Sequence, residues 1–457
     1  MRTSLLTADR RLSALTARQR LTLAGALMVA ALALRLLIFA HYPYAPINDA
    51  RTYLRSASAI AHTGTYQDAN HAAGGTHGPS AYFPPAYSYL LALADLITGG
   101  PALSSATVTL ARLIQVALGT GSVALLGLSA FELFGSGTAL TTLALGAIYP
   151  VALELSAVLA AENLLTLLEL AALYAVLRAG RSAAPSRWLV SAGVLIGLAA
   201  LTHSNALVLL VPLGFGAQRL GRRPGAVHRA LPARAPWVTL LVCAALTVTP
   251  WMVRNLVVMG GFVPISSEAG ITLAGTYNST SARSDPPYRW VYFADVPSLS
   301  RYVRLAPQLT ELQLSSRLES AALGYVRRHP LAPLSVGLHN TLRLLELEGS
   351  AAWRDSAASI GIDLGLAQIG VVSFWIVALL ALAGALTRAA RDTPRWVWGV
   401  PLAMWLSVVL VNAETPRFRE PIDPFLILLA ACALNELGRR LVVPAASAAA
   451  GLKPAGD

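Results

Sequence analysis

Charged residues are scarce in this chain, and their scarcity excludes most classes of soluble protein. Only 13% of its 457 residues are charged and 55% are hydrophobic, whereas a soluble globular protein carries about 25% charged and about 45–50% apolar residues. The same figures exclude an intrinsically disordered chain, a collagen-like fibre and a coiled coil. The composition predicts an all-α integral membrane protein that crosses the bilayer many times.

Cysteine and lysine are also nearly absent. Cys243 and Cys432 both lie inside apolar runs, so they predict no disulfide framework and indicate no redox compartment. Lys453 is the only lysine, and arginine therefore carries nearly all of the net charge of +12. A basic chain can bind nucleic acid, but a membrane protein concentrates arginine in its cytoplasmic loops. We therefore predict no nucleic-acid partner.

Sequence motifs of common soluble enzymes are missing as well. The chain has no GxxxxGK[ST] phosphate loop, no dinucleotide-binding GxGxxG turn, no HExxH and no GxSxG. His71, His77 and His203 are not spaced as metal ligands, so no metal site is predicted. The sequence indicates no cofactor with certainty and leaves a requirement for a divalent metal open.

What the chain does contain is a series of apolar runs. A helix needs about 20 mostly apolar residues to cross the hydrocarbon core of a bilayer. The first run, from about Leu21 to Ala40, is long for a signal peptide and contains Arg35, so we interpret it as a retained span. Ten spans are expected, and residues 330–350 could hold an eleventh. The nine further runs are 110–134, 137–158, 163–179, 188–202, 206–220, 236–258, 366–387, 396–413 and 424–438.

The distribution of arginine predicts the orientation of these spans. With a cytoplasmic N-terminus, the basic residues fall in the cytoplasmic connections, and the short outer connections near 159–162 and 203–205 carry no arginine or lysine. An even number of spans returns the C-terminus to the cytoplasm. The residues that support this register are Arg178, Arg181, Arg187, Arg219, Arg222, Arg223, Arg229, Arg234, Arg388, Arg391, Arg395, Arg439, Arg440 and Lys453.

Two predicted outer segments, 41–109 and 259–365, are too long to be simple connectors. Both contain many aromatic residues, which is not typical of disorder. The stretch Pro84–Thr98 is apolar but too short to span, so we expect a helix lying in the outer interface. Residues 317–348 predict two amphipathic helices, separated near a pair of prolines.

These patterns divide the chain into four regions. They are an N-terminal transmembrane core at 1–258 with a catalytic outer loop at 41–109, an outer loop with amphipathic helices at 259–365, C-terminal transmembrane helices at 366–440, and a mobile cytoplasmic tail at 441–457.

Polar residues gather at the predicted outer ends of the spans. Asp49 follows the first span closely, where a solvated loop carboxylate is the plain alternative to a functional one. Glu162 lies between two spans, where it could also act as a first-turn helix acid. Arg254 ends the seventh span and could simply extend toward the interface. Arg417 and Arg419 stand beside prolines; guanidinium forks suit phosphate oxygens, although an arginine–glutamate surface pair explains them equally well.

Seven segments in chain order carry a recognisable pattern: INDARTYLRSASAIAHTGTY, YFPPAYSYLLAL, LAAENLLTLLELAALY, GLAALTHSNALVLLVPL, PWMVRNLVVMGGFVPISSEAG, YVRRHPLAPLSVGLHNTLRLLE and RFREPIDPFLILLAA. In this order they resemble the polytopic glycosyltransferases of the glycosyltransferase C fold that use lipid-phosphate sugars, in the branch of aminoarabinose transferase and protein O-mannosyltransferases. The resemblance implies an enzyme of the cell membrane that moves a hexosyl or pentosyl group from a polyprenyl-monophosphate donor. The acceptor would be a hydroxyl of a glycan, lipid or protein at the extracytoplasmic face. We expect a single displacement that inverts the anomeric centre, because only one carboxylate, Asp49, is placed at the acceptor side.

The resemblance also implies roles for individual residues. Asp49 and Glu162 would be the catalytic carboxylates. The remaining predicted residues would bind the donor phosphate or line the site: Arg254, Arg417, Arg419, His203, Tyr53, Tyr82 and Tyr87. The chain departs from the family pattern in two places. Aminoarabinose transferase has a lysine beside its interfacial helix where this chain has Tyr82-Phe83-Pro84-Pro85, and His203 stands where relatives have arginine.

A second class of protein stays open on sequence alone. A secondary transporter or a flippase of lipid-linked sugars would also be polytopic, with polar residues near the middle of the membrane. In this chain the conspicuous polar residues lie at the predicted outer boundary, and this position favours the transferase.

Overall fold

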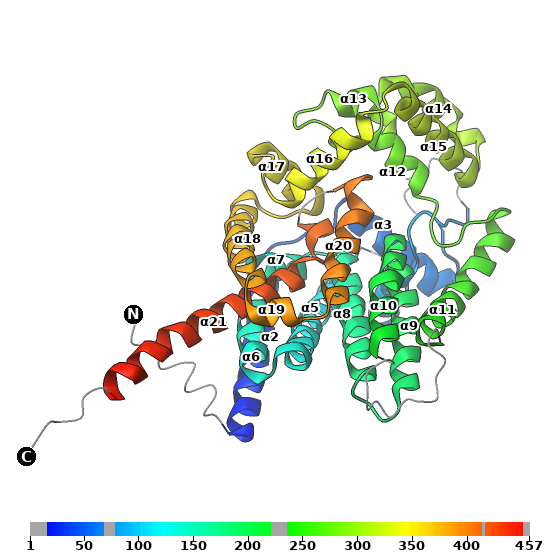
Figure 1. Ribbon diagram of the computed structural model, residues 1–457. Coiled ribbons are helices and arrows are strands. Elements are labelled where there is room, and N and C mark those ends of the chain that lie inside the picture. The colour runs from blue at the N-terminus through cyan, green and yellow to red at the C-terminus, as the bar shows by residue number, and fades with distance from the viewer. Residues whose placement is uncertain (1–15, 68–77, 102, 221–234, 414–415, 451–457) are drawn as a thin grey trace, which may run out of the picture.

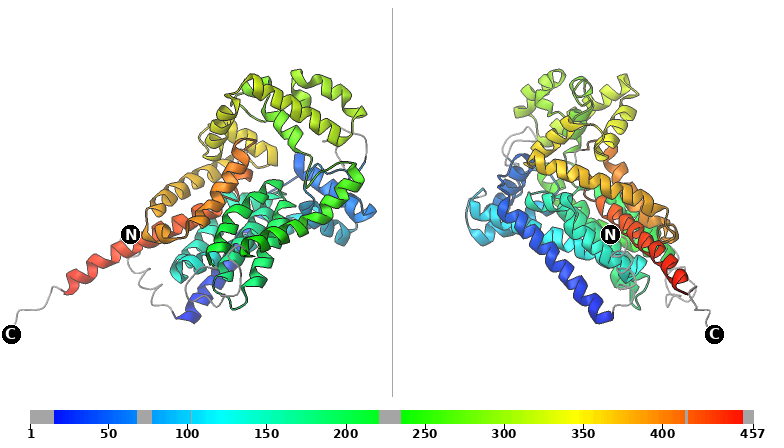
Figure 2. Two further views of the ribbon diagram at one scale, coloured as in Figure 1. Left: turned by 45° about the vertical axis from the view of Figure 1, so that its right-hand side comes forward. Right: turned by 90° about the vertical axis from the view of Figure 1, so that its left-hand side faces the viewer.

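The helices form a bundle with a cap at one end. The computed structural model describes residues 16–67, 78–101, 103–220, 235–413 and 416–450. Within these residues every element is a helix, apart from an isolated antiparallel bridge between Gln67 and Pro79. Long helices make up the bundle in Figure 1, and shorter helices from the second half of the chain make up the cap. The two other views in Figure 2 keep the cap at the same end. The predicted all-α class is confirmed.

Each of the ten predicted spans coincides with a helix or with a pair of helices. In chain order these are α2 (Ala17–His41), α5 (Ser105–Phe134), α6 with α7 (Ser136–Ile148 and Pro150–Ala157), α8 (Glu162–Ala179), α9 (Pro185–Ala200), η1 with α10 (Ser204–Leu209 and Leu210–Leu220), α11 (Ala235–Met259), α18 (Leu364–Ala385), α20 (Arg395–Val409) and α21 (Asp423–Ala450). Helix α21 continues past Arg440, where the sequence predicted that the C-terminal spans end.

Some of these helices have the length and the apolar composition that a membrane span requires. Among the described residues, four helices are long and apolar enough to cross a membrane, namely α2, α5, α11 and α18. The pair α6–α7, bent by 50°, adds a fifth when it is taken as one broken span, and α9 and α20 are shorter apolar helices. The chain is a membrane protein.

Small residues let the bundle helices approach closely. Gly193 and Gly197 lie one turn apart on α9; a Cβ on Gly193 would stand 2.8 Å from the carbonyl oxygen of Leu240 on α11. A Cβ on Gly384 of α18 would stand 1.9 Å from the carbonyl oxygen of Leu429 on α21. Since lipid is as apolar as leucine, membrane helices associate through such close packing and not through burial of apolar surface.

The first outer segment contains two helices, α3 (Asn48–Thr63) and α4 (Ala86–Thr98). Helix α4 occupies the stretch that the sequence predicted as an interfacial helix. Its apolar side chains lie on two faces of the helix: Leu91 is buried, while Leu93 and Ile97 are exposed. One apolar face of α4 therefore packs on the protein, and the other is left for lipid.

The second outer segment folds into the cap. Its main helices are α12 (Ala269–Thr276), α13 (Ser279–Ala282), α14 (Ser300–Leu305), α15 (Glu311–Arg328), α16 (Ala332–Leu344) and α17 (Ser350–Ile360). The predicted break between two amphipathic helices is confirmed, since α15 ends at Arg328 and α16 begins at Ala332. With 13 residues, α16 is shorter than the about 20 that a span needs. It is not the eleventh span that the sequence allowed at 330–350.

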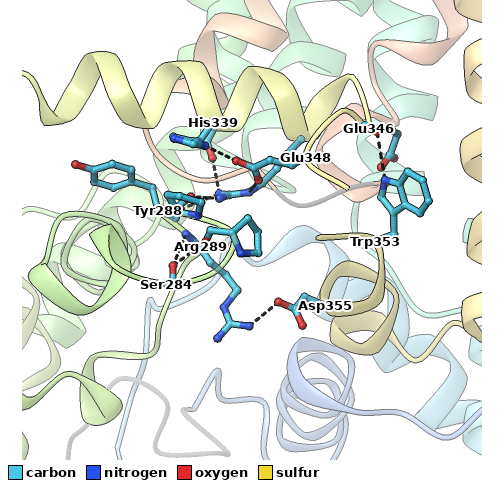
Figure 3. Close-up of polar contacts among 12 residues, drawn as sticks. Ser284, Tyr288, Arg289, His339, Glu346, Glu348, Trp353 and Asp355 are labelled. Carbon is cyan, nitrogen blue, oxygen red and sulfur yellow. Dashed lines mark hydrogen bonds and ion pairs between the residues drawn. The ribbon is translucent and has the colours of Figure 1, made fainter. Parts of the chain in front are cut away.

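Ion pairs hold the cap together (Figure 3). Arg289 Nη1 lies 2.5 Å from Asp355 Oδ2 of α17. The carboxylate of Glu348 lies 2.5 Å from His339 Nδ1 and 2.5 Å from Arg343 Nε, both on α16. The first pair fastens the loop before η2 (Phe293–Asp295) to α17, and the other two fasten α16 to the segment that follows it. Arg343 Nη1 also donates to the carbonyl oxygen of Tyr288 at 2.8 Å, which fastens the same loop to α16, so the cap is an ordered unit and not a set of loose loops.

Some sequence predictions concern residues outside the described part of the chain. They are the basic residues Arg222, Arg223, Arg229, Arg234 and Lys453, the histidines His71 and His77, and residues 451–457 of the predicted tail.

Candidate active site

Residues far apart in the sequence meet at the capped end of the bundle. Connections that follow alternate spans lie at the same end, so the connections after α2, α7, α9, α11 and α20 are neighbours. Asp49, Glu162, His203 and Arg417 each come from a different one of these connections. The sequence predicted that they share one side of the membrane, and the structure brings them together.

Arg417 joins the two predicted catalytic carboxylates. It lies in the 3-10 turn η5 (Arg417–Arg419). Its Nη2 donates to Asp49 Oδ2 at 2.8 Å, and its Nε donates to Glu162 Oε1 at 2.9 Å. The guanidinium therefore spans both acids, which lie 113 residues apart in the chain. A planar guanidinium can bond two acceptors at fixed angles, as lysine cannot.

The two carboxylates differ in exposure. The Glu162 side chain is 2% exposed, whereas that of Asp49 is 39% exposed. Glu162 is the first residue of α8, where a negative charge is also stabilised by the helix dipole. A ligand can therefore reach Asp49, while Glu162 stays behind Arg417 and fixes its position.

The backbone around Asn48 sets the direction of Asp49. Asn48 adopts a φ of 44°, a left-handed conformation that asparagine tolerates better than most residues. Its side-chain Nδ2 donates to the carbonyl oxygen of Ser359 at 2.9 Å, at the end of α17 in the cap. The cap thus helps to hold the start of α3, and with it Asp49.

These residues line a cavity of about 550 Å³. Asp49, Arg417 and His203 form part of its wall. Cavities of about 300–1,000 Å³ are typical of small-molecule sites. The remaining wall comes from α3, the YFPP segment, η1, the end of α20 and the cap, so each part of the fold at this end contributes to the cavity.

Aromatic side chains form one side of the cavity. Tyr53 and Tyr82 line it together with Phe83. The rings of Tyr53 and Phe83 are 4.8 Å apart, and Tyr87 stands edge-on behind Tyr53 at 4.9 Å. Burial raises the pKa of Tyr53 well above its usual value, so its hydroxyl stays neutral. Tyr87, the third predicted tyrosine, supports this wall from behind and is not among the residues that line the cavity.

His203 is the second neighbour of Glu162. Its Nε2 lies 3.8 Å from Glu162 Oε1. Burial lowers the pKa of His203, although the carboxylate of Glu162 acts in the opposite direction. The imidazole is therefore neutral at neutral pH, and it lines the cavity as a polar group without charge.

Arg254 lies away from the cavity. Its Nη1 donates to the carbonyl oxygen of Ser80 at 2.6 Å and its Nη2 to that of Tyr66 at 2.8 Å, while its guanidinium stacks 4.6 Å over the Trp251 ring. These contacts anchor the first outer loop to the end of α11.

Arg419 also lies away from the cavity. Its Nη1 donates to Glu346 Oε1 at 2.8 Å and its Nε to Asp423 Oδ1 at 3.0 Å. The Phe374 ring covers it at 3.7 Å. This arginine ties the cap to α18 and α21.

Sequence reasoning missed several residues of the cavity wall, and Glu268 is the most notable. Its Oε1 accepts from Ser204 Oγ and Ser266 Oγ, both at 3.4 Å. Burial and the nearby Asp49 charge raise the pKa of Glu268 to about 7. A signal was present in the sequence, because Glu268 follows the seventh span at the same outer boundary as the other acids. Asn205, Trp290 and Phe418 also line the cavity.

In the part of the chain that the structure describes, no three histidine, cysteine, aspartate or glutamate side chains are grouped so that they could hold a metal ion. The geometry points to a binding site built from one shared guanidinium, carboxylates, aromatic rings and neutral polar groups.

Comparison with known proteins places this arrangement in a class. Residues 83–253 match the family model described as dolichyl-phosphate-mannose-protein mannosyltransferase. No curated protein sequence matches significantly. Among solved structures, the Archaeoglobus fulgidus oligosaccharyltransferase AglB with an inhibitory peptide and a dolichol-phosphate is similar over 96% of this chain, with 15% identity and a TM-score of 0.54. The same oligosaccharyltransferase in its apo form covers 97% of the chain with 16% identity and a TM-score of 0.56. ArnT from Cupriavidus metallidurans bound to undecaprenyl phosphate is 14% identical over 94% of this chain and 81% of its own, with a TM-score of 0.41.

The structure has the fold that the resemblance in the sequence implied, the glycosyltransferase C fold of membrane proteins, because the oligosaccharyltransferase matches over nearly the whole chain. The family model matches less than half of the chain and agrees with the resemblance over residues 83–253. This chain spans about half the length of the archaeal oligosaccharyltransferase, 52% in one structure and 53% in the other.

Proposed function

We propose that this protein is a membrane glycosyltransferase, which moves a sugar from a polyprenyl-monophosphate donor to an acceptor hydroxyl. The observation that carries the proposal is Arg417, held between Asp49 and Glu162 at the wall of a cavity at one end of the bundle. The mannosyltransferase family match and the structural similarity to an oligosaccharyltransferase solved with a dolichol-phosphate support the choice of reaction.

In the proposed reaction, Arg417 binds the donor phosphate. The acceptor hydroxyl attacks the anomeric carbon, and the bond between that carbon and the phosphate oxygen breaks. The electron pair leaves with the polyprenyl phosphate, whose growing negative charge the fixed guanidinium stabilises. Asp49 takes the proton of the acceptor hydroxyl. A single displacement of this kind inverts the anomeric centre.

Glu162 positions Arg417 and does not contact the substrate. Its burial and its 2.9 Å bond to Nε keep the guanidinium aimed at the cavity when a phosphate competes with Asp49 for Nη2. Tyr53, Tyr82 and His203 contribute neutral walls, and Tyr87 packs behind them. In this proposal Arg254 and Arg419 maintain the fold around the site and do not bind the donor phosphate.

The donor enters from lipid. Leu207 of η1 and Val408 and Val411 at the end of α20 line the same cavity as Asp49 and Arg417. This part of the wall is apolar, and Leu207 is 39% exposed. An isoprenoid chain can lie against it while the phosphate reaches Arg417. The acceptor, a hydroxyl of a glycan, a lipid or a protein, would approach from beneath the cap.

The capped end faces away from the cytoplasm in this proposal, and both termini are cytoplasmic. Four arginines support this orientation, because they lie at the end of the bundle opposite the cavity. They are Arg178 in the last turn of α8, and Arg181, Arg388 and Arg391 in the connections at that end. At that end Arg178 and Arg181 pair with Glu132 of α5, at 3.0 and 2.7 Å.

A transfer assay tests the proposal. The purified full-length protein in lipid nanodiscs is incubated with a panel of polyprenyl-phosphate sugars and membrane-extract acceptors, beside the Asp49→Asn variant. The wild type should transfer at least one sugar. Asp49→Asn should lose about 10²–10⁴-fold in turnover while still binding donor, because the amide cannot accept the proton. A transporter would instead keep most of its flux in this variant and transfer nothing.

A further inference from the structure

One part of the cavity wall comes from the cap. Glu268 and Trp290 both line the cavity, and both belong to the segment 259–365. Like Asp49 and Arg417, they lie outside residues 83–253, the part that matches the mannosyltransferase family model.

Glu268 has unused capacity to accept hydrogen bonds. It precedes α12, and both of its hydrogen bonds, from Ser204 and Ser266, fall on Oε1. Oε2 has no hydrogen-bond partner within the described residues, although the carboxyl group lines the cavity. An ionised carboxylate has about four acceptor positions, so this group can accept from further hydroxyl groups.

Trp290 lines the cavity with its ring and not with its N–H group. The indole Nε1 is buried and has no hydrogen-bond partner within the described residues. The Nε1 edge packs on α12, because a Cβ on Gly275 would stand 2.3 Å from Nε1. This packing fixes the ring in position, and Trp290 borders the cavity through atoms other than Nε1.

The two residues together suit a sugar ring. A carboxylate accepts from hydroxyl groups, an aromatic ring packs against the C–H face of a sugar, and neighbouring amides such as Asn205 and Asn412 both donate and accept. Arg417, the phosphate ligand of the proposed reaction, lines the same cavity. The donor's phosphate and its sugar would therefore contact different parts of one wall.

We propose that Glu268 and Trp290 form the sugar-recognition subsite of the donor, in which Glu268 accepts hydrogen bonds from the hydroxyl groups of the sugar and the Trp290 ring packs against the sugar. This inference rests on the proposed transferase function. Glu268 acts in it as a specificity residue, since it bonds the sugar and takes no part in the proton transfer. The phosphate contact with Arg417 is independent of this subsite.

Binding measurements on two kinds of lipid test the inference. The probes are undecaprenyl monophosphate, which has no sugar, and the undecaprenyl-phosphate esters of mannose, glucose, galactose and arabinose. Affinities are measured for the wild type and for Glu268→Gln in nanodiscs. Glu268→Gln should bind the preferred sugar ester about tenfold or more weakly, as expected for loss of a hydrogen bond to a charged group, and should bind undecaprenyl monophosphate as the wild type does.

Two further variants make the result specific. Trp290→Leu removes the aromatic ring, so it should weaken binding of the sugar ester by a smaller factor and leave binding of the bare carrier unchanged. Glu319→Gln makes the same chemical change as Glu268→Gln on the exposed face of α15 and should change neither affinity. If Glu268→Gln does not fold, Trp290→Leu carries the test.

Each other outcome has a distinct meaning. If both variants keep the wild-type preference for the sugar ester over the bare carrier, the subsite is wrong while the proposed function stands. Equal weakening of both lipids would also overturn the subsite, because it would place Glu268 at the phosphate. If the wild type binds neither kind of lipid, the proposed function itself fails, and the subsite with it.

Discussion

Arg417 and Arg419 stand two residues apart in one short turn and have opposite surroundings. Arg417 lines the cavity, where Asp49 is 39% exposed and a ligand has access to the guanidinium. Arg419 is enclosed by Glu346, Asp423 and the Phe374 ring. The surroundings of Arg417 are open, and its partner Asp49 is accessible to a ligand. The surroundings of Arg419 are closed, and its carboxylate partners are themselves buried.

The difference shows what separates a binding arginine from a structural one. Both make short, charge-assisted hydrogen bonds to two carboxylates, so the number and length of the contacts do not distinguish them. The two arginines differ in the accessible volume beside the guanidinium, which only Arg417 has. In a 3-10 turn, residues two apart point in different directions, and the turn η5 directs Arg417 to the cavity and Arg419 to the junction of cap and bundle.

The largest expected effect comes from Arg417→Lys. Lysine keeps the charge but cannot bond Asp49 and Glu162 in one fork. We expect about 10²–10³-fold lower turnover with a melting temperature close to that of the wild type, because the charge that neutralises Glu162 remains. Turnover in nanodiscs and thermal unfolding in detergent measure the two quantities. Wild-type turnover in this variant would contradict a role for Arg417 in catalysis.

Arg419→Ala should produce the reverse pattern. It leaves Glu346 and Asp423 buried without their cation, and breaking a buried ion pair in this way costs about 3–5 kcal/mol of folding stability. Thermal unfolding should show a large decrease in melting temperature, while the fraction that remains folded should turn over at a rate near that of the wild type. A stable but inactive Arg419→Ala protein would remove the distinction between the two arginines.

The smallest expected effect is on pH dependence. Glu268 has a pKa of about 7, raised by burial and by Asp49, while Arg417 acts in the opposite direction. A carboxyl with a raised pKa is ionised above that value and gains a proton below it. Its ionised fraction should fall from about 0.9 at pH 8 to about 0.1 at pH 6.

Affinity for the preferred sugar ester should therefore fall by up to about tenfold between pH 8 and pH 6 in the wild type, and the fall should be absent from Glu268→Gln. The pKa of His203 is lowered, so His203 stays neutral over most of this range and contributes little. An identical pH profile in Glu268→Gln would assign the effect to another group.

The sequence predicted the bundle well because apolar runs of membrane length have few alternatives to a helix. It also predicted that Asp49, Glu162 and Arg417 lie on one side of the membrane, because the order of the spans determines the side on which each connection lies. It could not separate Arg417 from Arg419, because the direction of each side chain depends on a turn of three residues. It missed Trp290, because this residue reaches the cavity only through the folding of the cap. For Glu268 the sequence held one signal, its place after the seventh span at the same outer boundary as the other acids.

Binding of undecaprenyl monophosphate to the wild type and to the matched variants Arg417→Gln and Arg419→Gln tests the central claim most directly. The claim predicts that the wild type and the folded Arg419→Gln protein bind with similar affinity, and that Arg417→Gln binds at least about tenfold more weakly, as expected for loss of a charge-assisted contact with phosphate. Equal affinity in the wild type and Arg417→Gln would contradict the claim.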